Sequence, residues 1–124
     1  MTITKYKKWI WENLTVPYIR KRDGKGDYGR CFTCGIVKSI KELHCGHWRH
    51  GSTKQTYYYE KNIHLQCRNC NFYRDGARDI YAVKLEKCYG YGILQEIDVM
   101  DKPGFVWTIE KLKKIEEEYK NKLK

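Results

Sequence analysis

The chain has 124 residues, of which 41% are hydrophobic, and its 25 Lys and Arg against 15 Asp and Glu give a formal net charge of +10. This length suits a modest single core, so we expect residues 1–124 to form one domain. The charge favours a polyanionic partner such as nucleic acid, with a merely soluble basic surface as the alternative, and no stretch approaches the roughly 20 apolar residues of a membrane span.

The N-terminal segment, residues 1–29, is expected to be mainly helical. Its apolar and aromatic positions recur at helical spacing: Tyr6, Trp9, Ile10 and Leu14. Pro17 lacks an amide donor and should kink this segment or begin a second short helix. Asp23 to Asp27 is predicted to be a loop from its Gly and Asp content. Residues 1–12 lack the apolar core of a secretory signal, so we expect a cytoplasmic protein.

Residues 30–90 are expected to form the central core. Residues 36–49 favour a short strand, and Tyr57 to Tyr59 has β propensity and should pair back across the polar loop 50–56. A helix is predicted from Cys67 to about Cys88, interrupted near Gly76. Glycines at 90 and 92 should end it, because left-handed positions past a helix end favour glycine.

Residues 91–124 are expected to be a linker followed by a final helix. Thr108 is a good N-cap, with Glu110 in the first turn. One apolar stripe follows the helix: Ile109, Leu112, Ile115, Tyr119 and Leu123. We favour docking of this stripe on its own domain over the alternative of a dimer helix.

Four of the six cysteines form two C-x-x-C pairs, Cys31 with Cys34 and Cys67 with Cys70, separated by 32 residues. In a reducing compartment such pairs indicate metal ligands rather than disulfides. Two pairs complete a tetrahedral zinc site with no open position, so the zinc should be structural. Cys45 and Cys88 lack this spacing, and we expect them to be small buried apolar side chains.

The chain between and after the cysteine pairs carries a second pattern: His47 at the end of a strand, Asn62 in the next turn and Asn71 at a helix start. This is the HNH arrangement. A neutral imidazole can accept a proton from water near pH 7, and Mg²⁺ or Mn²⁺ takes oxygen and imidazole ligands. Asn62 can hold the loop by hydrogen bonding. We therefore predict an α+β fold: a small, zinc-stapled treble-clef core (ββα-metal, HNH-like) with flanking N- and C-terminal helices.

From about residue 15 to residue 123, the sequence resembles the NinG (Rap) family of lambdoid phages. The matching stretches are Tyr18 to Asp23, Cys31 to Gly35, Gly46 to Arg49, Asn62 to Asn71 and Trp107 to Glu110. These proteins are HNH-type recombination endonucleases that cleave branched DNA such as Holliday junctions and D-loops. The resemblance implies the same activity, a structural Zn²⁺ and a catalytic Mg²⁺ or Mn²⁺. It also implies action in the cytoplasm of a phage-infected cell.

The resemblance also implies residue roles. His47 would be the general base or a metal neighbour, Asn62 the middle Asn, and Asn71 a ligand of the catalytic ion. HNH enzymes commonly place a metal ligand immediately before the base, where this chain has Gly46. His44 is therefore a candidate ligand, with a surface histidine as the alternative. His64 could orient Asn62 or a phosphate, or be a packed histidine, and His50 is expected to be only solvated.

Basic residues should bind DNA through its phosphates, which gives salt-dependent affinity with little base specificity. The candidates are Arg20, Lys21, Arg22, Arg49, Lys54, Lys61, Arg68, Arg74 and Arg78. Trp48, Tyr73 and Tyr57 to Tyr59 could stack on unpaired bases, although the tyrosine run is better explained by a half-buried strand. Symmetric resolution of a junction needs two active sites, so a homodimer is possible. The alternatives are a non-catalytic zinc-finger DNA-binding module and an HNH nicking endonuclease acting on duplex DNA.

Overall fold

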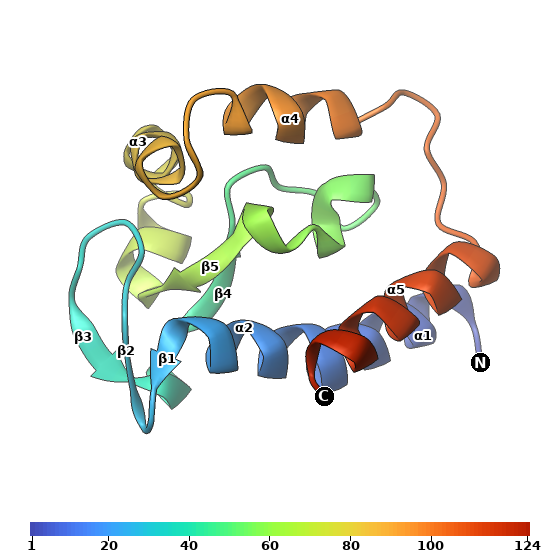
Figure 1. Cartoon of the computed structure of the whole chain (residues 1–124), viewed down its shortest axis with the longest axis horizontal. Coiled ribbons are helices and arrows are strands. Elements are labelled where there is room, and N and C mark those ends of the chain that lie inside the picture. The colour runs from blue at the N-terminus through green and yellow to red at the C-terminus, as the bar shows by residue number, and fades with distance from the viewer.

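The computed structural model describes residues 1–124 and begins with a helical arm along one side of the molecule (Figure 1). α1 (Ile3–Ile10) and α2 (Val16–Asp23) are joined by a π-helical turn, Trp11–Thr15. The prediction of a helical start with a second helix near Pro17 is confirmed. Pro17 lies in the first turn of α2, directly after the π-helical turn, where the backbone hydrogen bonding has already changed from the α-helical pattern.

Two small antiparallel sheets follow. β1 (Gly24–Lys25), β2 (Tyr28–Arg30) and β3 (Val37–Ser39) form one sheet in that order, and β4 (His44–His47) pairs with β5 (Ile63–Gln66) in the other. The segment 23–27 was predicted to be a loop, but only residues 26 and 27 form a turn, because Asp23 ends α2 and Gly24–Lys25 form β1, which pairs with β2. Residues 36–49 contain two strands that belong to different sheets, not one.

The prediction of a strand at Tyr57 to Tyr59 is wrong. Residues 55–58 form a 3₁₀ turn, and the strand that pairs with β4 comes later, at β5. The three tyrosines point to three different partners: Tyr57 to Trp11, Tyr58 to the backbone of Lys7, and Tyr59 to a carboxylate of α4. These tertiary contacts decide the conformation of the three tyrosines. The β propensity of tyrosine describes only how well it fits a pleated sheet surface, and here it is overridden.

Three helices complete the chain: α3 (Arg78–Tyr89), α4 (Ile93–Met100) and α5 (Ile109–Lys122). The predicted interruption near Gly76 is confirmed, because a π-helical turn at Asn69–Tyr73 precedes α3. Gly90 and Gly92 have φ of +96° and +103° and end α3 as expected. α4 was not predicted. Its Ile93 and Ile97 are buried with Tyr81 and Leu85 of α3, whereas Val99 of the same helix is exposed.

α5 lies along α1 (Figure 1) and buries Leu112 and Tyr119 against the N-terminal arm. The predicted docking of the apolar stripe on its own chain is confirmed. The hydroxyl of Thr108 accepts the amide of Lys111 at 3.2 Å, as expected of an N-cap. No helix is long and apolar enough to span a membrane.

Candidate metal centre and catalytic site

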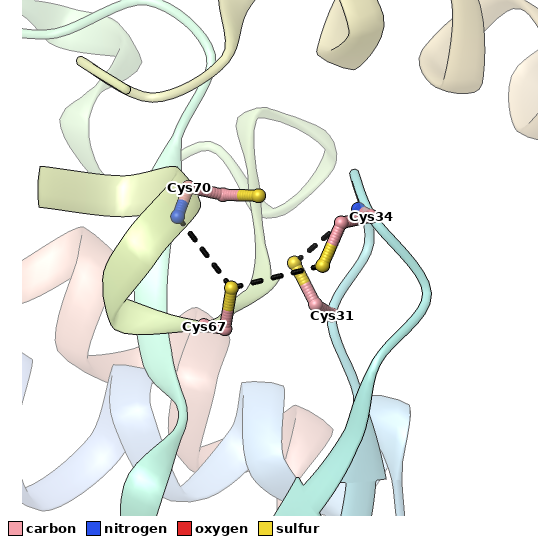
Figure 2. Close-up of side chains that lie close together, drawn as sticks. All are labelled: Cys31, Cys34, Cys67 and Cys70. Atoms are coloured by element: carbon pink, nitrogen blue, oxygen red, sulfur yellow. Dashed lines mark hydrogen bonds between the residues drawn. The ribbon is translucent and has the colours of Figure 1, made fainter. Parts of the chain in front are cut away.

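The four predicted cysteines converge between the loop after β2 and the helical turn after β5 (Figure 2), and their sulfur atoms all lie within 4.8 Å of one another. Cys34 Sγ and Cys67 Sγ are 3.7 Å apart, close to the roughly 3.8 Å between sulfurs in tetrahedral zinc with Zn–S bonds of about 2.3 Å. In each pair the amide of the second cysteine points at the first sulfur at 3.5 Å. Such amides stabilise thiolates, so the donor set fits Zn²⁺.

The pKa values of the cysteine thiols also favour a bound divalent ion at this cluster. Burial raises the pKa of Cys34 to about 12, whereas hydrogen bonds from Thr33 and backbone amides outweigh burial at Cys31 and lower its pKa to about 6. Without a cation, adjacent thiolates repel one another, so a divalent ion is needed to ionise all four. Cys45 and Cys88 lie outside the cluster, and Cys88 is exposed rather than buried as expected.

His47 ends β4 and Asn62 directly precedes β5, and the Asn62 side chain fixes the long loop between these two strands. The Asn62 side chain is fully buried. Its Oδ1 accepts the amide of Arg49 at 2.8 Å, and its Nδ2 donates to the carbonyls of Arg49 and Thr56 at 3.0 and 3.1 Å. Asn62 therefore ties both sides of the long loop 48–56 together, the holding role predicted for it.

His47 lies at the end of β4 in a cluster of three rings. Its centroid is 5.0 Å from Trp11 and 4.8 Å from Tyr57. Nε2 is 2.8 Å from the Tyr57 carbonyl, which can only accept, so Nε2 carries the proton and Nδ1 is the basic nitrogen. Burial lowers the His47 pKa to about 4. The imidazole is therefore neutral at pH 7, the state that a general base requires.

Gly46 of β4 lies close to Asn71, which belongs to the π-helical turn after β5, and to the side chain of Gln66. A β-carbon on Gly46 would meet Gln66 Oε1 at 1.9 Å and Asn71 Oδ1 at 2.9 Å. The Gln66 amide nitrogen donates to Thr33 Oγ1 at 3.1 Å and to the Gly76 carbonyl at 2.9 Å. The position before His47 must therefore be glycine, because the Gln66 amide occupies the place of a side chain there.

The other three histidines occupy different surroundings. His44 is exposed at the start of β4, beside Cys34 and Cys67. His64 is buried and its ring stacks on Phe32. The Tyr81 hydroxyl donates its hydrogen to the Gly46 carbonyl at 2.7 Å, so it can only accept a hydrogen bond from His64 Nδ1. Of the two roles predicted for His64, the structure therefore favours the packed histidine, and burial lowers its pKa to about 3.

His50 was expected to be only solvated, and this expectation is wrong. It is half-buried, and its Nε2 lies 2.9 Å from the position of a β-carbon on Gly76. Burial, with the nearby Arg78 guanidinium, lowers the His50 pKa. His50 and Gln66 are the residues that the sequence-based prediction missed. The two glycines beside them, at 46 and 76, were the available signal, since glycine marks close approach of other groups.

The nine predicted DNA-binding residues fall into different settings. Arg22 is tied to Asp23 and to two backbone carbonyls, and its role is structural. Three others face carboxylates of α4 or its C-terminal end: Arg49 with Asp98 and Asp101, Lys54 with Asp101 and Lys61 with Glu96. Arg20 is half-buried. The remaining four are exposed: Lys21, Arg68, Arg74 and Arg78. Tyr73 is 67% exposed, so it is free to stack on a base.

The family described as "Bacteriophage Lambda NinG protein" matches residues 2–124, so the chain belongs to the NinG family. It is 35% identical over 108 residues to Protein ninG of Salmonella phage P22, covering 86% of this chain and 51% of that protein. It is 35% identical to Protein ninG of Escherichia phage lambda, and the match covers 86% of this chain and 50% of that protein. It is 32% identical to Protein ninG of Escherichia phage 933W, and the match covers 86% of this chain and 51% of that protein. The chain thus spans about half the length of these curated relatives. No solved structure matches it.

Proposed function

We propose that this NinG-family chain is a metal-dependent, structure-selective HNH endonuclease that cleaves branched DNA, such as Holliday junctions or D-loops, in phage recombination. One observation carries the proposal: His47, Asn62 and Asn71 are arranged around a single β-hairpin held against the cysteine cluster. The order of cysteine knuckle, hairpin and helical turn is that of a treble clef. The choice of branched substrates follows from the family resemblance.

The chain's own residues support hydrolysis of a phosphodiester. His47 Nδ1 accepts a proton from the attacking water, and the bond from Nε2 to the Tyr57 carbonyl fixes the ring and its tautomer. Asn62 holds the loop that follows His47. A divalent ion, with Asn71 as one ligand and His44 or His47 as sequence-based candidates, would stabilise charge on the phosphate and leaving oxygen. Exposed Arg68, Arg74 and Arg78 bind neighbouring phosphates.

A non-catalytic zinc-finger module is the second candidate, and one observation favours it. The Gln66 amide fills the place where HNH enzymes commonly have a ligand, and only the four cysteines form a cluster of Cys, His, Asp or Glu able to hold a metal. A module of this kind would bind DNA without cutting it. A duplex-nicking HNH enzyme is the third candidate.

His47→Gln tests the proposal. Gln can still donate to the Tyr57 carbonyl but cannot take a proton. We expect wild-type protein loaded with Zn²⁺ to cut a synthetic four-way junction with Mg²⁺ or Mn²⁺, and the variant to be slower by about 10²–10⁴ with junction binding retained. A fully active variant would remove His47 from the mechanism. Equal cutting of linear duplex would favour the nicking enzyme.

A further inference from the structure

Two aromatic side chains stand exposed on the π-helical turn Asn69–Tyr73, which includes the last cysteine of the cluster. Phe72 is 68% exposed and Tyr73 is 67% exposed. Their rings meet edge to face, with centroids 5.1 Å apart and ring planes at 88°. Tyr91 is exposed too, but no aromatic residue adjoins it in the chain. Contiguous apolar surface that faces water marks an interaction site, so this pair of rings indicates a partner.

The backbone that carries the two rings is held in one shape. Across the turn, the Arg74 amide donates to the Asn69 carbonyl at 2.9 Å, and the Gly76 amide donates to the Cys70 carbonyl at 2.8 Å. Cys70 is itself fully buried in the cysteine cluster. Residues 75–77 then have φ of +49°, +85° and +49°, a left-handed conformation that non-glycine residues keep only where surrounding contacts hold it. The rings are therefore presented on a fixed support beside the cluster.

Three arginines without a carboxylate partner flank the two rings in the chain. Arg68, Arg74 and Arg78 are exposed, and none of them takes part in an ion pair. The guanidinium of Arg68 lies 5.8 Å from the centroid of the Tyr73 ring, and Arg74 follows Tyr73 directly. Against these three charges, Asp75 is the only carboxylate between residues 68 and 78. Cations next to exposed aromatic rings suit a nucleic-acid strand, because the cations bind phosphates while bases stack on the rings.

A second copy of the chain would fit this surface less well. A twofold interface brings the same patch of both copies together, so the three arginines of one copy would face those of the other. Such juxtaposed like charges oppose association, whereas a DNA strand neutralises them. The charges therefore favour nucleic acid as the partner of Phe72 and Tyr73.

Bases with an open face occur where a DNA helix is interrupted. Inside a continuous duplex both faces of every base are stacked on neighbours, and opening one costs unstacking energy, which is smallest where a stack already ends. Phe72 also follows Asn71, whose Oδ1 lies 2.9 Å from the β-carbon position of Gly46, the residue before His47. The two rings are thus close to the strand that carries the proposed general base.

We propose that Phe72 and Tyr73 stack on bases left open at the branch point of DNA, while Arg68 and Arg74 bind the adjoining phosphates. This contact selects branched over linear DNA. The assignment rests on the proposed function for its substrate class, and it adds the side chains that recognise that class.

Binding without Mg²⁺ or Mn²⁺ tests the proposal independently of cleavage. Zinc-loaded wild type and the double variant Phe72→Ala with Tyr73→Ala are titrated into a four-way junction and into linear duplexes built from its arm sequences. We expect the double variant to lose at least about tenfold in junction affinity, because the stacking of a single base has an effect of that order, while its duplex affinity stays unchanged. An equal loss on both DNAs, or no loss on the junction, would overturn the proposal.

Two control variants separate stacking from charge and from the mere loss of an exposed ring. Tyr91→Ala removes the exposed ring between α3 and α4 and should bind both DNAs like wild type. Arg68→Ala with Arg74→Ala should weaken binding of junction and duplex alike and lower the salt slope by about two. The urea midpoint of the aromatic double variant should match wild type, because both rings are mostly exposed. Self-association of wild type that this variant abolishes would assign the surface to a dimer and overturn the proposal.

These outcomes are separate from those for the endonuclease. Selective junction binding that depends on Phe72 and Tyr73, in a protein that never cuts DNA, would leave the stacking contact standing and remove the endonuclease. Junction cleavage by the aromatic double variant with the selectivity of wild type would remove only the stacking contact.

Discussion

Gly46→Ala tests the arrangement of Gly46, Gln66 and Asn71 through stability. The new β-carbon would lie 1.9 Å from Gln66 Oε1, so the Gln66 side chain must move. Moving it breaks the hydrogen bonds of 3.1 and 2.9 Å to Thr33 and Gly76. Two such bonds contribute about 1 kcal/mol each, and overpacking costs about 1–3 kcal/mol. We expect a total loss of about 3–5 kcal/mol in the free energy of unfolding.

A double-mutant cycle with Gln66→Ala isolates the cause. With the Gln66 side chain removed, Gly46→Ala should cost less than about 1 kcal/mol, giving a coupling energy of roughly 2–4 kcal/mol. Urea unfolding of the zinc-loaded proteins measures all four values, with equal m-values as a check. A cost that is the same in both backgrounds would refute the packing argument.

Three further predictions follow from charges and metal. His47 and His64 are neutral when folded but bind protons below pH 6.5 when unfolded, so stability falls on acidification from pH 6.5 toward 4, by about 1 kcal/mol per residue for the first pH unit. Urea unfolding with zinc saturating should show this, and a flat profile would contradict their burial. Asp98→Asn with Asp101→Asn frees Arg49 and Lys54, so junction binding by fluorescence anisotropy should tighten and its salt slope steepen by up to about two; unchanged binding would place both residues away from DNA. Stripping zinc from the four cysteines should abolish cooperative unfolding, and an unchanged Tm would contradict a structural ion.

The sequence predicted best those features that depend on local spacing. The C-x-x-C pairs and the glycines after α3 act within a few residues, so their geometry is already present in the sequence. The cap of α5 is equally local, because Thr108 and Lys111 lie in one turn.

Features set by tertiary packing were not predicted. Tyr58 leaves the strand pattern because α1 and α5 surround it, and α4 needs α3 to bury Ile97. In the candidate site, too, local motifs were predicted and contacts set by tertiary packing were not. His47, Asn62 and Asn71 were recognisable as a motif, whereas Gln66 meets Gly46 only through the register of β4 with β5, and His50 meets Gly76 only through the turn there.

Cleavage of a branched substrate tests the central proposal most directly. Zinc-loaded wild-type protein is incubated with Mg²⁺ or Mn²⁺ and an excess of protein over a synthetic four-way junction, beside linear duplexes built from the same arm sequences. The proposal predicts paired cuts near the branch point and intact duplexes. An uncut junction with either ion, in a preparation that binds the junction, would contradict it.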